Sequence, residues 1–291
     1  MIAGTQPVVN ALSFDIEDWF HMVEIEAVAD ASKWDSWESL VERYTDWIIE
    51  TVTDAGVRAT FFVLGWVAER YPQLIRSMVE HGHEVASHSY WHRKVYDLDA
   101  ERFDEDLRRS IDVIEDAGGQ RVRGFRAPSF SITPGTEWAM DVLLDAGLDY
   151  DASLFPAARA HGGYPCDPGP HVSSIAPSGR PMPELPMTMM RLGPVTLPFS
   201  GGGYMRLLPG WLLRRGFHQL NAKGRPAVVY LHPRDFAPDC PRVPMSLKRR
   251  FKCYVGAGST KGKLKMLLDR FTFDTCAAVL GLDAPDTLAA S

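Results

Sequence analysis

Short apolar runs alternate with segments of helical periodicity along most of this chain, and that alternation limits the fold most strongly. Strands are predicted at residues 8–14, 59–64, 84–87, 121–125, 148–150 and 226–231. Helices are predicted between Asp35 and Gly56 and at residues 66–70, 73–80, 100–117, 136–146 and 211–222. Strands and helices in this order build right-handed βαβ units around a parallel sheet, either open and doubly wound or closed as a barrel. The predicted fold class is therefore α/β.

The composition excludes several kinds of protein. The net charge of −6 gives no basic footprint, so nucleic acid is not an expected partner. The four cysteines form no Cys-x-x-Cys pair, which argues against a zinc ribbon and against a disulfide framework. No apolar run approaches the ~20 residues of a membrane-spanning helix, and the N-terminus lacks the features of a signal peptide. We therefore expect a cytoplasmic protein.

Two stretches depart from the strand-helix rhythm. Residues 156–209 are rich in Pro, Gly, Met and Ser, and we expect irregular or short-hairpin structure there that covers one face of the sheet and lines a groove. Residues 236–291 form an extension whose basic stretch, 248–252, is interpreted as a solvated loop. A last helix is predicted over about 262–270.

Ionisable side chains follow the predicted strands at the points where they end. They are Asp15 with Glu17 and Asp18, His88 with His92, Arg126, Asp151, and His232. Because parallel strands all point one way, residues just past their carboxyl ends meet at one face of a sheet or barrel. Separate segments of the chain therefore bring acids, imidazoles and a guanidinium to one place.

These residue types supply the parts of a metal-assisted hydrolase. Two imidazoles and a carboxylate suit a borderline ion such as Zn²⁺ and leave coordination positions open. A second carboxylate beside the ion can take a proton from its water, and a separate histidine can protonate a leaving amine. Arg126 would keep the catalytic carboxylate ionised and oriented. The set outlines amide or ester hydrolysis.

An ordered set of motifs runs from about residue 8 to 235. It comprises Ser13-Phe14-Asp15, Thr60–Gly65, His88-Ser89-Tyr90-Trp91-His92, Arg126-Ala127-Pro128, Tyr150-Asp151-Ala152-Ser153 and Leu231-His232. In this order the motifs resemble those of the polysaccharide deacetylases, the NodB-homology or carbohydrate esterase family 4 enzymes. The Asp-x-Glu-Asp-Trp-Phe opening, the Ser200–Tyr204 glycine segment and the extended C-terminus resemble the subgroup found with exosortase-linked exopolysaccharide gene clusters.

The resemblance implies a distorted (β/α) barrel that holds a divalent metal, Zn²⁺ in preference to Co²⁺, Ni²⁺ or Mn²⁺. It also implies removal of N-acetyl groups from an amino-sugar polysaccharide or oligosaccharide, with release of acetate. The catalytic domain would span residues 1–235, including the groove-forming segment 156–209, and residues 236–291 would pack on the barrel. Exopolysaccharide assembly proteins are candidate partners, and through them the protein would associate with a membrane-bound assembly system.

The resemblance also implies roles for the motif residues. Asp15 matches the general base, His232 the general acid, and Arg126 the residue that orients the base. His88 and His92 match metal ligands.

Further positions match parts of the site around these groups. Asp151 matches a member of the charge network, and Leu231 matches a residue of the acetate-methyl pocket. Trp19, Trp91 and Tyr204 are candidates for stacking on sugar rings.

Departures from the family pattern leave two points open. A second Asp usually follows the base, but Ile16 stands there, so the metal carboxylate must be Glu17 or Asp18, and we prefer Asp18. Ser129-Phe130 and Pro233 replace the more usual residues of their motifs, which leaves the oxyanion donor and the partner of the acid open. The alternatives are a metal-independent hydrolase of a cyclic amide or ureide and a catalytically silent glycan-binding module.

Overall fold

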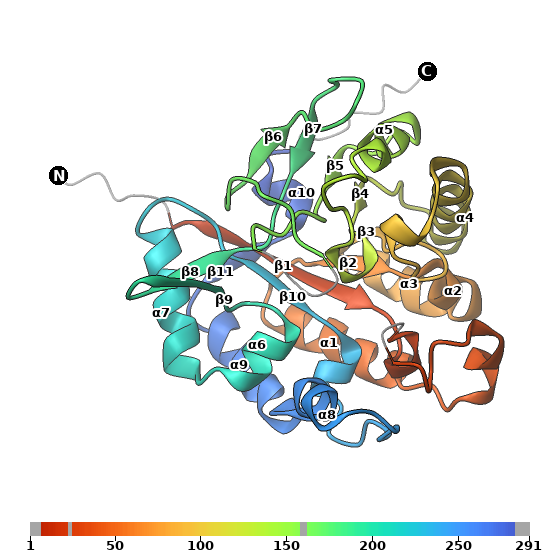
Figure 1. The fold of residues 1–291 in the computed structure, drawn as a ribbon. Helices are drawn as coiled ribbons and strands as arrows, with labels where there is room; N and C mark the ends of the chain where they lie inside the picture. Colours follow the sequence, from red (N-terminus) through yellow and green to blue (C-terminus); the bar gives the residue numbers. More distant parts are fainter. Residues whose placement is uncertain (1–6, 23–24, 158–161, 283–291) are drawn as a thin grey trace.

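The computed structural model describes residues 7–22, 25–157 and 162–282, and its framework is a curled sheet of mainly parallel strands (Figure 1). The strands are β1 (Val9–Ile16), β2 (Thr60–Val63), β3 (Glu84–Ser87), β4 (Gly124–Phe125), β5 (Tyr150–Asp151), β6 (His171–Ser173), β7 (Met182–Glu184), β8 (Met189–Leu192), β9 (Val195–Pro198), β10 (Val228–Leu231) and β11 (Thr272–Asp274). In these described ranges, nine strands form one sheet in the order β10-β1-β2-β3-β4-β5-β7-β6, with β11 beside β1. The predicted α/β fold with a distorted barrel is confirmed as a half-barrel.

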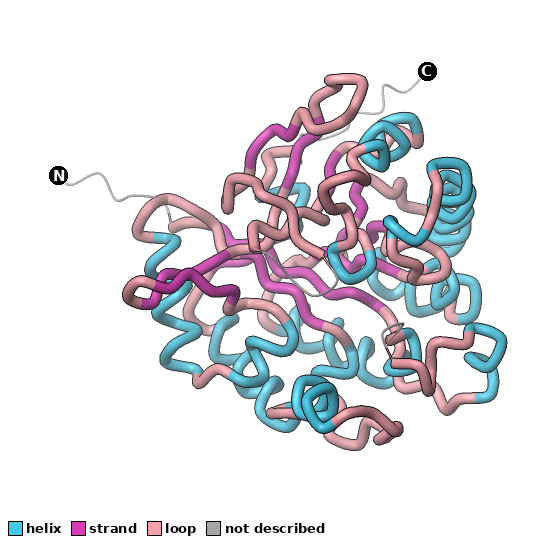
Figure 2. The backbone as a smooth tube through the Cα atoms, viewed as in Figure 1, coloured by secondary structure: helices cyan, strands magenta, loops and turns pink. Residues whose placement is uncertain are grey.

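Helices surround the strands on the outside of the curl (Figure 2). The α-helices are α1 (Val41–Asp54), α2 (Gly65–Arg70), α3 (Pro72–Glu80), α4 (Ala100–Gly118), α5 (Trp138–Asp145), α6 (Gly202–Leu207), α7 (Gly210–Asn221), α8 (Leu247–Tyr254), α9 (Thr260–Leu268) and α10 (Cys276–Val279). Short 3-10 helices are η1 (Trp19–His21), η2 (Ala31–Ser36), η3 (Val95–Asp97), η4 (Pro128–Phe130), η5 (Pro233–Phe236) and η6 (Ala257–Ser259). Within the described part of the chain, no helix combines the length and apolar character needed to cross a lipid bilayer.

The register of the parallel strands aligns their carboxyl ends at one edge of the sheet. Ile16 of β1 pairs with Val63 of β2, which in turn pairs with Ser87 of β3. Phe125 of β4 continues the row beside Ser87, and Asp151 of β5 pairs with Phe125. A side chain within a residue or two of this row therefore lies at the same edge, whichever strand carries it.

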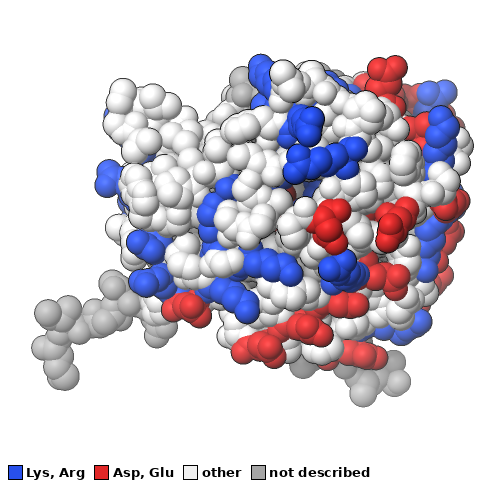
Figure 3. Space-filling model, turned by 90° about the horizontal axis from the view of Figure 1, so that it is seen from below, with Lys and Arg blue, Asp and Glu red and all other residues white. Residues whose placement is uncertain are grey.

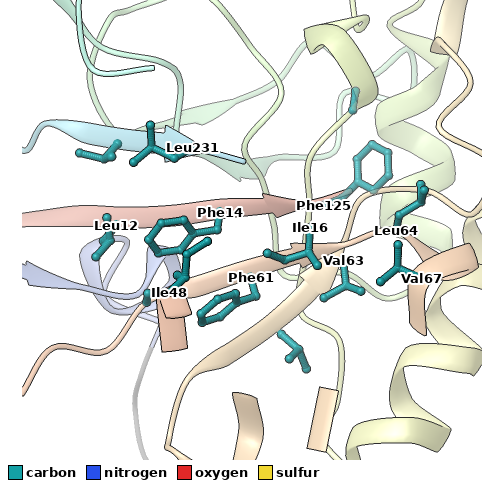
Figure 4. Close-up of a cluster of buried hydrophobic side chains, with 14 of the residues drawn as sticks. Leu12, Phe14, Ile16, Ile48, Phe61, Val63, Leu64, Val67, Phe125 and Leu231 are labelled. Carbon is teal, nitrogen blue, oxygen red and sulfur yellow. The ribbon is translucent and has the colours of Figure 1, made fainter. Parts of the chain in front are cut away.

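Alternation along the central strand β1 separates two hydrophobic clusters. Leu12, Phe14 and Ile16 belong to the large cluster between the sheet and the helices (Figure 4). Ala11 belongs to a second cluster on the concave side of the sheet. Successive side chains of a strand point to opposite faces, so Asp15 lies on the concave side with Ala11.

The irregular segment 156–209 contains two short antiparallel pairs, apart from residues 158–161, which lie outside the described ranges. β6 pairs with β7, and β8 pairs with β9. β7 also pairs in parallel with β5, so the segment extends the main sheet. A parallel bridge between Gly201 and Tyr230 then places the start of α6 beside β10. This is short-hairpin structure of the kind expected from the sequence.

Two local predictions are wrong. The helix expected directly after Asp35 begins at Val41, and a 3-10 helix occupies residues 31–36. The basic stretch 248–252 lies within helix α8 and is not a loop. The last predicted helix, expected over about 262–270, is present as α9. It is followed by β11, which pairs with β1 and brings this part of the chain into the central sheet.

Replacing Phe14 with Ala should lower the free energy of unfolding by about 3–5 kcal/mol, because it leaves a cavity in a fully buried part of the central strand. The ring of Phe14 stacks on that of Phe61 at a centroid distance of 5.4 Å. Denaturant unfolding followed by circular dichroism measures the change. The control is Phe251→Ala. The Phe251 side chain is 57% exposed, so its loss should change the free energy of unfolding by less than about 0.5 kcal/mol. Equal losses in the two variants would contradict this account of the core.

Candidate active site

A hollow of about 510 Å³ opens at the carboxyl edge of the sheet. Its lining includes Asp15, Glu17, His88, His92 and His232, which come from the ends of β1, β3 and β10 or the segments that follow them. Residues of α6 and α8 complete the opposite wall. The structure therefore brings together the acids and imidazoles that the sequence places at strand ends.

Arg126, which follows β4, carries a fully buried guanidinium next to Asp15. Its Nη1 donates to Asp15 Oδ1 at 2.7 Å and to Ser13 Oγ at 2.9 Å. Its Nε donates to the carbonyl oxygen of Ala152 at 3.3 Å, and its guanidinium carbon lies 4.0 Å from the ring centre of Phe62. Burial lowers the pKa of Arg126, but the surrounding interactions, of which the charge of Asp15 is the largest, together outweigh it and hold the pKa above its ordinary value. The pair is therefore a fixed ion pair that orients one oxygen of Asp15.

Glu17, His88 and His92 bring three ligand atoms within 4.8 Å of one another, all on buried side chains. His92 Nε2 lies 2.7 Å from Glu17 Oε2. His88 Nδ1 lies 2.7 Å from the carbonyl oxygen of Arg126, and a proton on Nδ1 leaves Nε2 as the ligand nitrogen. Two imidazoles and a carboxylate form a donor set that suits Zn²⁺.

The charge states of Glu17 and His88 also fit a divalent ion. Burial lowers the pKa of His88 to about 4, so its imidazole is neutral at pH 7. Burial raises the pKa of Glu17, but His92, Arg234 and His232 together outweigh it and hold the pKa well below its ordinary value. Metal ions require deprotonated ligands, and both groups already have that form without an ion.

The loop after β3 holds His92 in an unusual backbone conformation. Ser89 has φ +67° and His92 has φ +55°. Both values lie in the left-handed region, which residues with a Cβ rarely adopt. The carboxylate of Asp106 in α4 accepts the N–H groups of Tyr90 and Trp91 at 2.7 and 3.1 Å, and so fixes the loop. No signal in the sequence singles out Asp106, since it is one of several acids in its helix.

Asp18, the metal carboxylate preferred from the sequence, has other partners. It accepts the N–H groups of Leu40 and Val41 at 3.0 and 3.2 Å and the hydroxyl of Ser39 at 2.5 Å. These donors belong to the N-terminus of α1, where backbone N–H groups have no partner within the helix. Asp18 therefore caps α1, and the structure puts Glu17 in its place beside the histidines.

His232 follows β10 and is held by the buried carboxylate of Asp235. Its Nδ1 lies 3.0 Å from Asp235 Oδ2, which also accepts the backbone N–H of His232 at 2.9 Å. Burial raises the pKa of Asp235, but Arg206 at 3.1 Å and His232 outweigh it and lower the pKa below its ordinary value. With Nδ1 held in this way, Nε2 lies 3.8 Å from Asp15 Oδ2 and 3.8 Å from Glu17 Oε1.

The residues around His232 show what the sequence reasoning missed. Asp235 follows the imidazole by three residues and forms a capping box at the start of η5, a spacing that is visible in the His-Pro-Arg-Asp sequence. Gly202 of α6 packs against this pair, and a Cβ there would lie 3.0 Å from Asp235 Oδ2 and 3.3 Å from His232 Nδ1. The glycine segment is therefore needed for close packing behind the imidazole.

Asp151 supports the site from outside the lining of the hollow. It accepts the N–H and hydroxyl of Ser153 at 3.0 and 2.5 Å, and Ser153 Oγ accepts the N–H of Ala127 at 2.8 Å. Burial raises the pKa of Asp151, and burial and the charge of Asp151 raise the pKa of its β-sheet partner Glu184 well above the ordinary range. The two carboxyls therefore share a proton and hold the backbone next to Arg126.

Of the four side chains predicted to contact substrate, Tyr204 lines the hollow. Trp19 is 1% exposed, and its indole N–H donates to a backbone carbonyl, so it is a core residue. Leu231 is fully buried on the helix side of β10, whereas its neighbour Tyr230 faces the hollow. The predictions for Trp19 and Leu231 are therefore wrong. Trp91 is half-buried and lies outside the lining.

Family models cover most of the chain in two parts. Residues 31–150 match the model described as polysaccharide deacetylase, and they include His88, His92 and Arg126. This part of the chain is a polysaccharide deacetylase domain. Residues 152–281 match a model described as a domain of unknown function, DUF3473.

Individual relatives of the deacetylase domain agree with this assignment. The peptidoglycan deacetylase of Helicobacter pylori is 31% identical over 96 residues, which cover 33% of this chain and 32% of that protein. The matched stretches span about a third of the length of the curated relatives. A Mycobacterium smegmatis protein assigned to the polysaccharide deacetylases has a crystal structure that matches with a TM-score of 0.67 at 18% identity, over 97% of this chain and 92% of that chain. Puue allantoinase matches with a TM-score of 0.63 at 16% identity, over 94% and 89% of the two chains. These two structures share the fold.

The residues that line the hollow come from three parts of the sequence, and only one of them is the deacetylase domain. Asp15 and Glu17 precede the range of the deacetylase model, and His88 and His92 lie inside it. His232 and the lining residues of α6 and α8 lie in the DUF3473 range. The region of unknown function therefore contributes a wall of the candidate site.

Replacing Glu17 with Gln should weaken Zn²⁺ binding by at least about 10–100-fold. Loss of a residue that only hydrogen-bonds to a metal ligand typically costs that much, and Glu17 is assigned as a ligand itself. Asp18→Asn is the matched control, since it makes the same chemical change one residue away from the trio. That variant should keep its metal affinity and lose stability, because both oxygens of Asp18 accept hydrogen bonds and an amide NH₂ in place of either one would face a donor. Calorimetric titration of the metal-free protein with Zn²⁺ separates the two. A larger loss of affinity in Asp18→Asn would overturn the assignment of Glu17.

Replacing Glu184 with Gln should stabilise the protein increasingly as the pH rises above about 4.5, the ordinary pKa of a glutamic acid. The native pair with Asp151 keeps a proton that the unfolded chain releases, so the native state binds more protons and the wild type loses stability as the pH rises. The glutamine amide replaces that proton with a permanent donor. Urea unfolding at pH 5 and pH 8 measures the difference. Glu184→Ala, the control, should destabilise at both pH values, and a pH-independent effect of Glu184→Gln would contradict the shared proton.

Proposed function

We propose that this chain is a metal-dependent hydrolase that removes N-acetyl groups from an amino-sugar polysaccharide of the exopolysaccharide type and releases acetate. The observation that carries the proposal is the position of His232 Nε2, which lies 3.8 Å from both Asp15 Oδ2 and Glu17 Oε1. A base, an acid and a set of metal-binding side chains therefore surround one small volume. The name of the Helicobacter pylori relative, a peptidoglycan deacetylase, supports the same reaction class.

Glu17, His88 and His92 would hold the ion, for which we propose Zn²⁺ before Co²⁺, Ni²⁺ or Mn²⁺. When bound, such an ion lowers the pKa of a water molecule and polarises a carbonyl group. Asp15 takes the proton of the attacking water, since Arg126 holds one of its oxygens and leaves the other directed at the hollow. The water oxygen then forms a bond with the acetyl carbon.

His232 acts on the other product. As the bond between the acetyl carbon and the nitrogen breaks, the amine takes a proton from Nε2 of His232. Asp235 keeps Nδ1 bound throughout and stabilises the imidazolium before it gives up that proton. The products are acetate and a free amino sugar. Tyr204 offers an aromatic face to a sugar ring at the edge of the hollow.

A metal-independent hydrolase of a cyclic amide or ureide is the second candidate, because Puue allantoinase shares the fold. The neutral imidazole of His88 beside the ionised Glu17 favours the metal-dependent reaction. A catalytically silent glycan-binding module is the third candidate. Acetate release from N-acetylglucosamine oligomers separates the proposed deacetylase from both alternatives, since neither of them produces acetate.

Asp15→Asn and His232→Ala should each lower kcat for acetate release by about 10²–10⁴-fold, because each removes one proton-transfer group. Bound metal should remain in both variants, since neither residue belongs to the trio of ligands. Acetate release from N-acetylglucosamine oligomers, measured together with elemental analysis, checks both statements. His218→Ala is the control, because that histidine is exposed and lies outside the lining. Loss of metal in His232→Ala would refute its role as the acid, and full activity in Asp15→Asn would refute the base.

A further inference from the structure

Basic side chains from the DUF3473 range form one wall of the hollow. They are Arg206, Arg234, Arg249 and Lys252. Among the described lining residues, the acidic ones are Asp15 and Glu17, and both already face cations or imidazoles within the site. Arg206 pairs with Asp235 and Arg234 faces Glu17, so Arg249 and Lys252 supply the exposed positive charge of the rim, although the chain as a whole has a net charge of −6.

We propose that this wall binds an anionic glycan, in which sugars near the N-acetylated residue carry carboxylate groups of the uronic acid type. This inference rests on the proposed function and names the class of its substrate. A guanidinium and a carboxylate form charge-assisted, often bidentate hydrogen bonds, and an ammonium group adds a second positive charge. Arg249 and Lys252 supply these two groups at the rim.

Helix α8 presents the two cations to the hollow on one of its faces. Arg249 and Lys252 are three residues apart, so they are neighbours on the helix surface, and both are exposed. Lys248 and Arg250 are exposed on the same helix but lie outside the lining of the hollow. Helix α8 itself contains no acidic residue.

Arg206 fixes the end of α8 to the site. Its Nη2 donates to the carbonyl oxygen of Lys252 at 2.8 Å, its Nη1 donates to that of Cys253, and its Nε pairs with Asp235 at 3.1 Å. At the other end, the N–H of Arg249 donates to the hydroxyl of Ser246 at 3.5 Å. The two rim cations are therefore carried by a helix whose position is tied to the imidazole of the site.

An anionic membrane is the rival ligand for this helix. α8 exposes Leu247 and Phe251 beside its cations, as interfacial helices do. Figure 3 views the face on which α8 lies and shows Lys and Arg side chains across it, whereas Asp and Glu side chains lie mainly toward its right and lower edges. The presence of Arg249 and Lys252 in the lining of the hollow favours the glycan, because a membrane surface cannot enter that space.

Oligomers of N-acetylglucosamine with some C6 alcohols oxidised to carboxylates are the probe, and the unoxidised oligomers are the neutral comparison. The wild type should show a KM about 10-fold lower for the oxidised oligomers at low ionic strength, and about 0.5 M salt should reduce this preference. The double variant Arg249→Gln/Lys252→Gln should bring the KM ratio close to one. The matched control is Lys248→Gln/Arg250→Gln, which removes the same charge from the same helix and should keep the ratio.

Equal KM values for the two oligomers in the wild type would overturn the proposal, and so would equal effects of the two double variants. Cosedimentation with vesicles of phosphatidylglycerol and phosphatidylcholine tests the membrane. Strong vesicle binding that both double variants weaken equally, with unchanged KM ratios, would assign α8 to the membrane instead. If the wild type releases acetate from neither oligomer, the proposed function fails on its own. Calorimetric affinities for the same two oligomers then decide whether the basic wall prefers the anionic one.

Discussion

The buried ion pair between Arg126 and Asp15 is the interaction on which the site depends. Removing one partner of such a pair leaves an uncompensated charge and costs about 3–5 kcal/mol, so the surrounding chain must satisfy the guanidinium. Ser13 of β1 accepts from Nη1, and the carbonyl of Ala152, just after β5, accepts from Nε, whereas Nη2 has no hydrogen-bond partner among the described residues. The carbonyl of Arg126 itself holds the imidazole of His88. One residue therefore orients the carboxylate of the proposed base and one nitrogen ligand of the proposed metal together.

The alternation of strands and helices was enough to predict the fold class and the meeting of the strand ends, because a parallel register aligns those ends by geometry alone. The choice between Glu17 and Asp18 could not be made in the same way. It depends on where the N-terminus of α1 lies, and that helix captures Asp18 through contacts distant in sequence. Likewise, Leu231 and Tyr230 are both apolar strand residues, and only the direction of the curl decides which one faces the hollow.

Residues from the whole chain, and not from its deacetylase domain alone, build the candidate site. The family model that names the chemistry covers residues 31–150, yet Asp15 lies before this range and His232 after it. Parallel pairing of β1 with β10 brings these two parts of the sequence together, because the strand that carries Asp15 lies beside the strand that His232 follows (Figure 1). The DUF3473 region then has a physical role: it completes the sheet, supplies the imidazole with its carboxylate partner, and builds the basic wall.

Arg206 links the imidazole of the site to helix α8. Its guanidinium pairs with the carboxylate of Asp235 behind His232 and donates to the carbonyls of Lys252 and Cys253. This one rigid group therefore sets the distance between the imidazole and the rim cations. A polymer whose charges engage α8 would present its acetamido groups to the hollow at a fixed offset along the strand of sugars. Deacetylation would then follow the periodicity of the charges, and the product would carry a regular pattern in place of a random one.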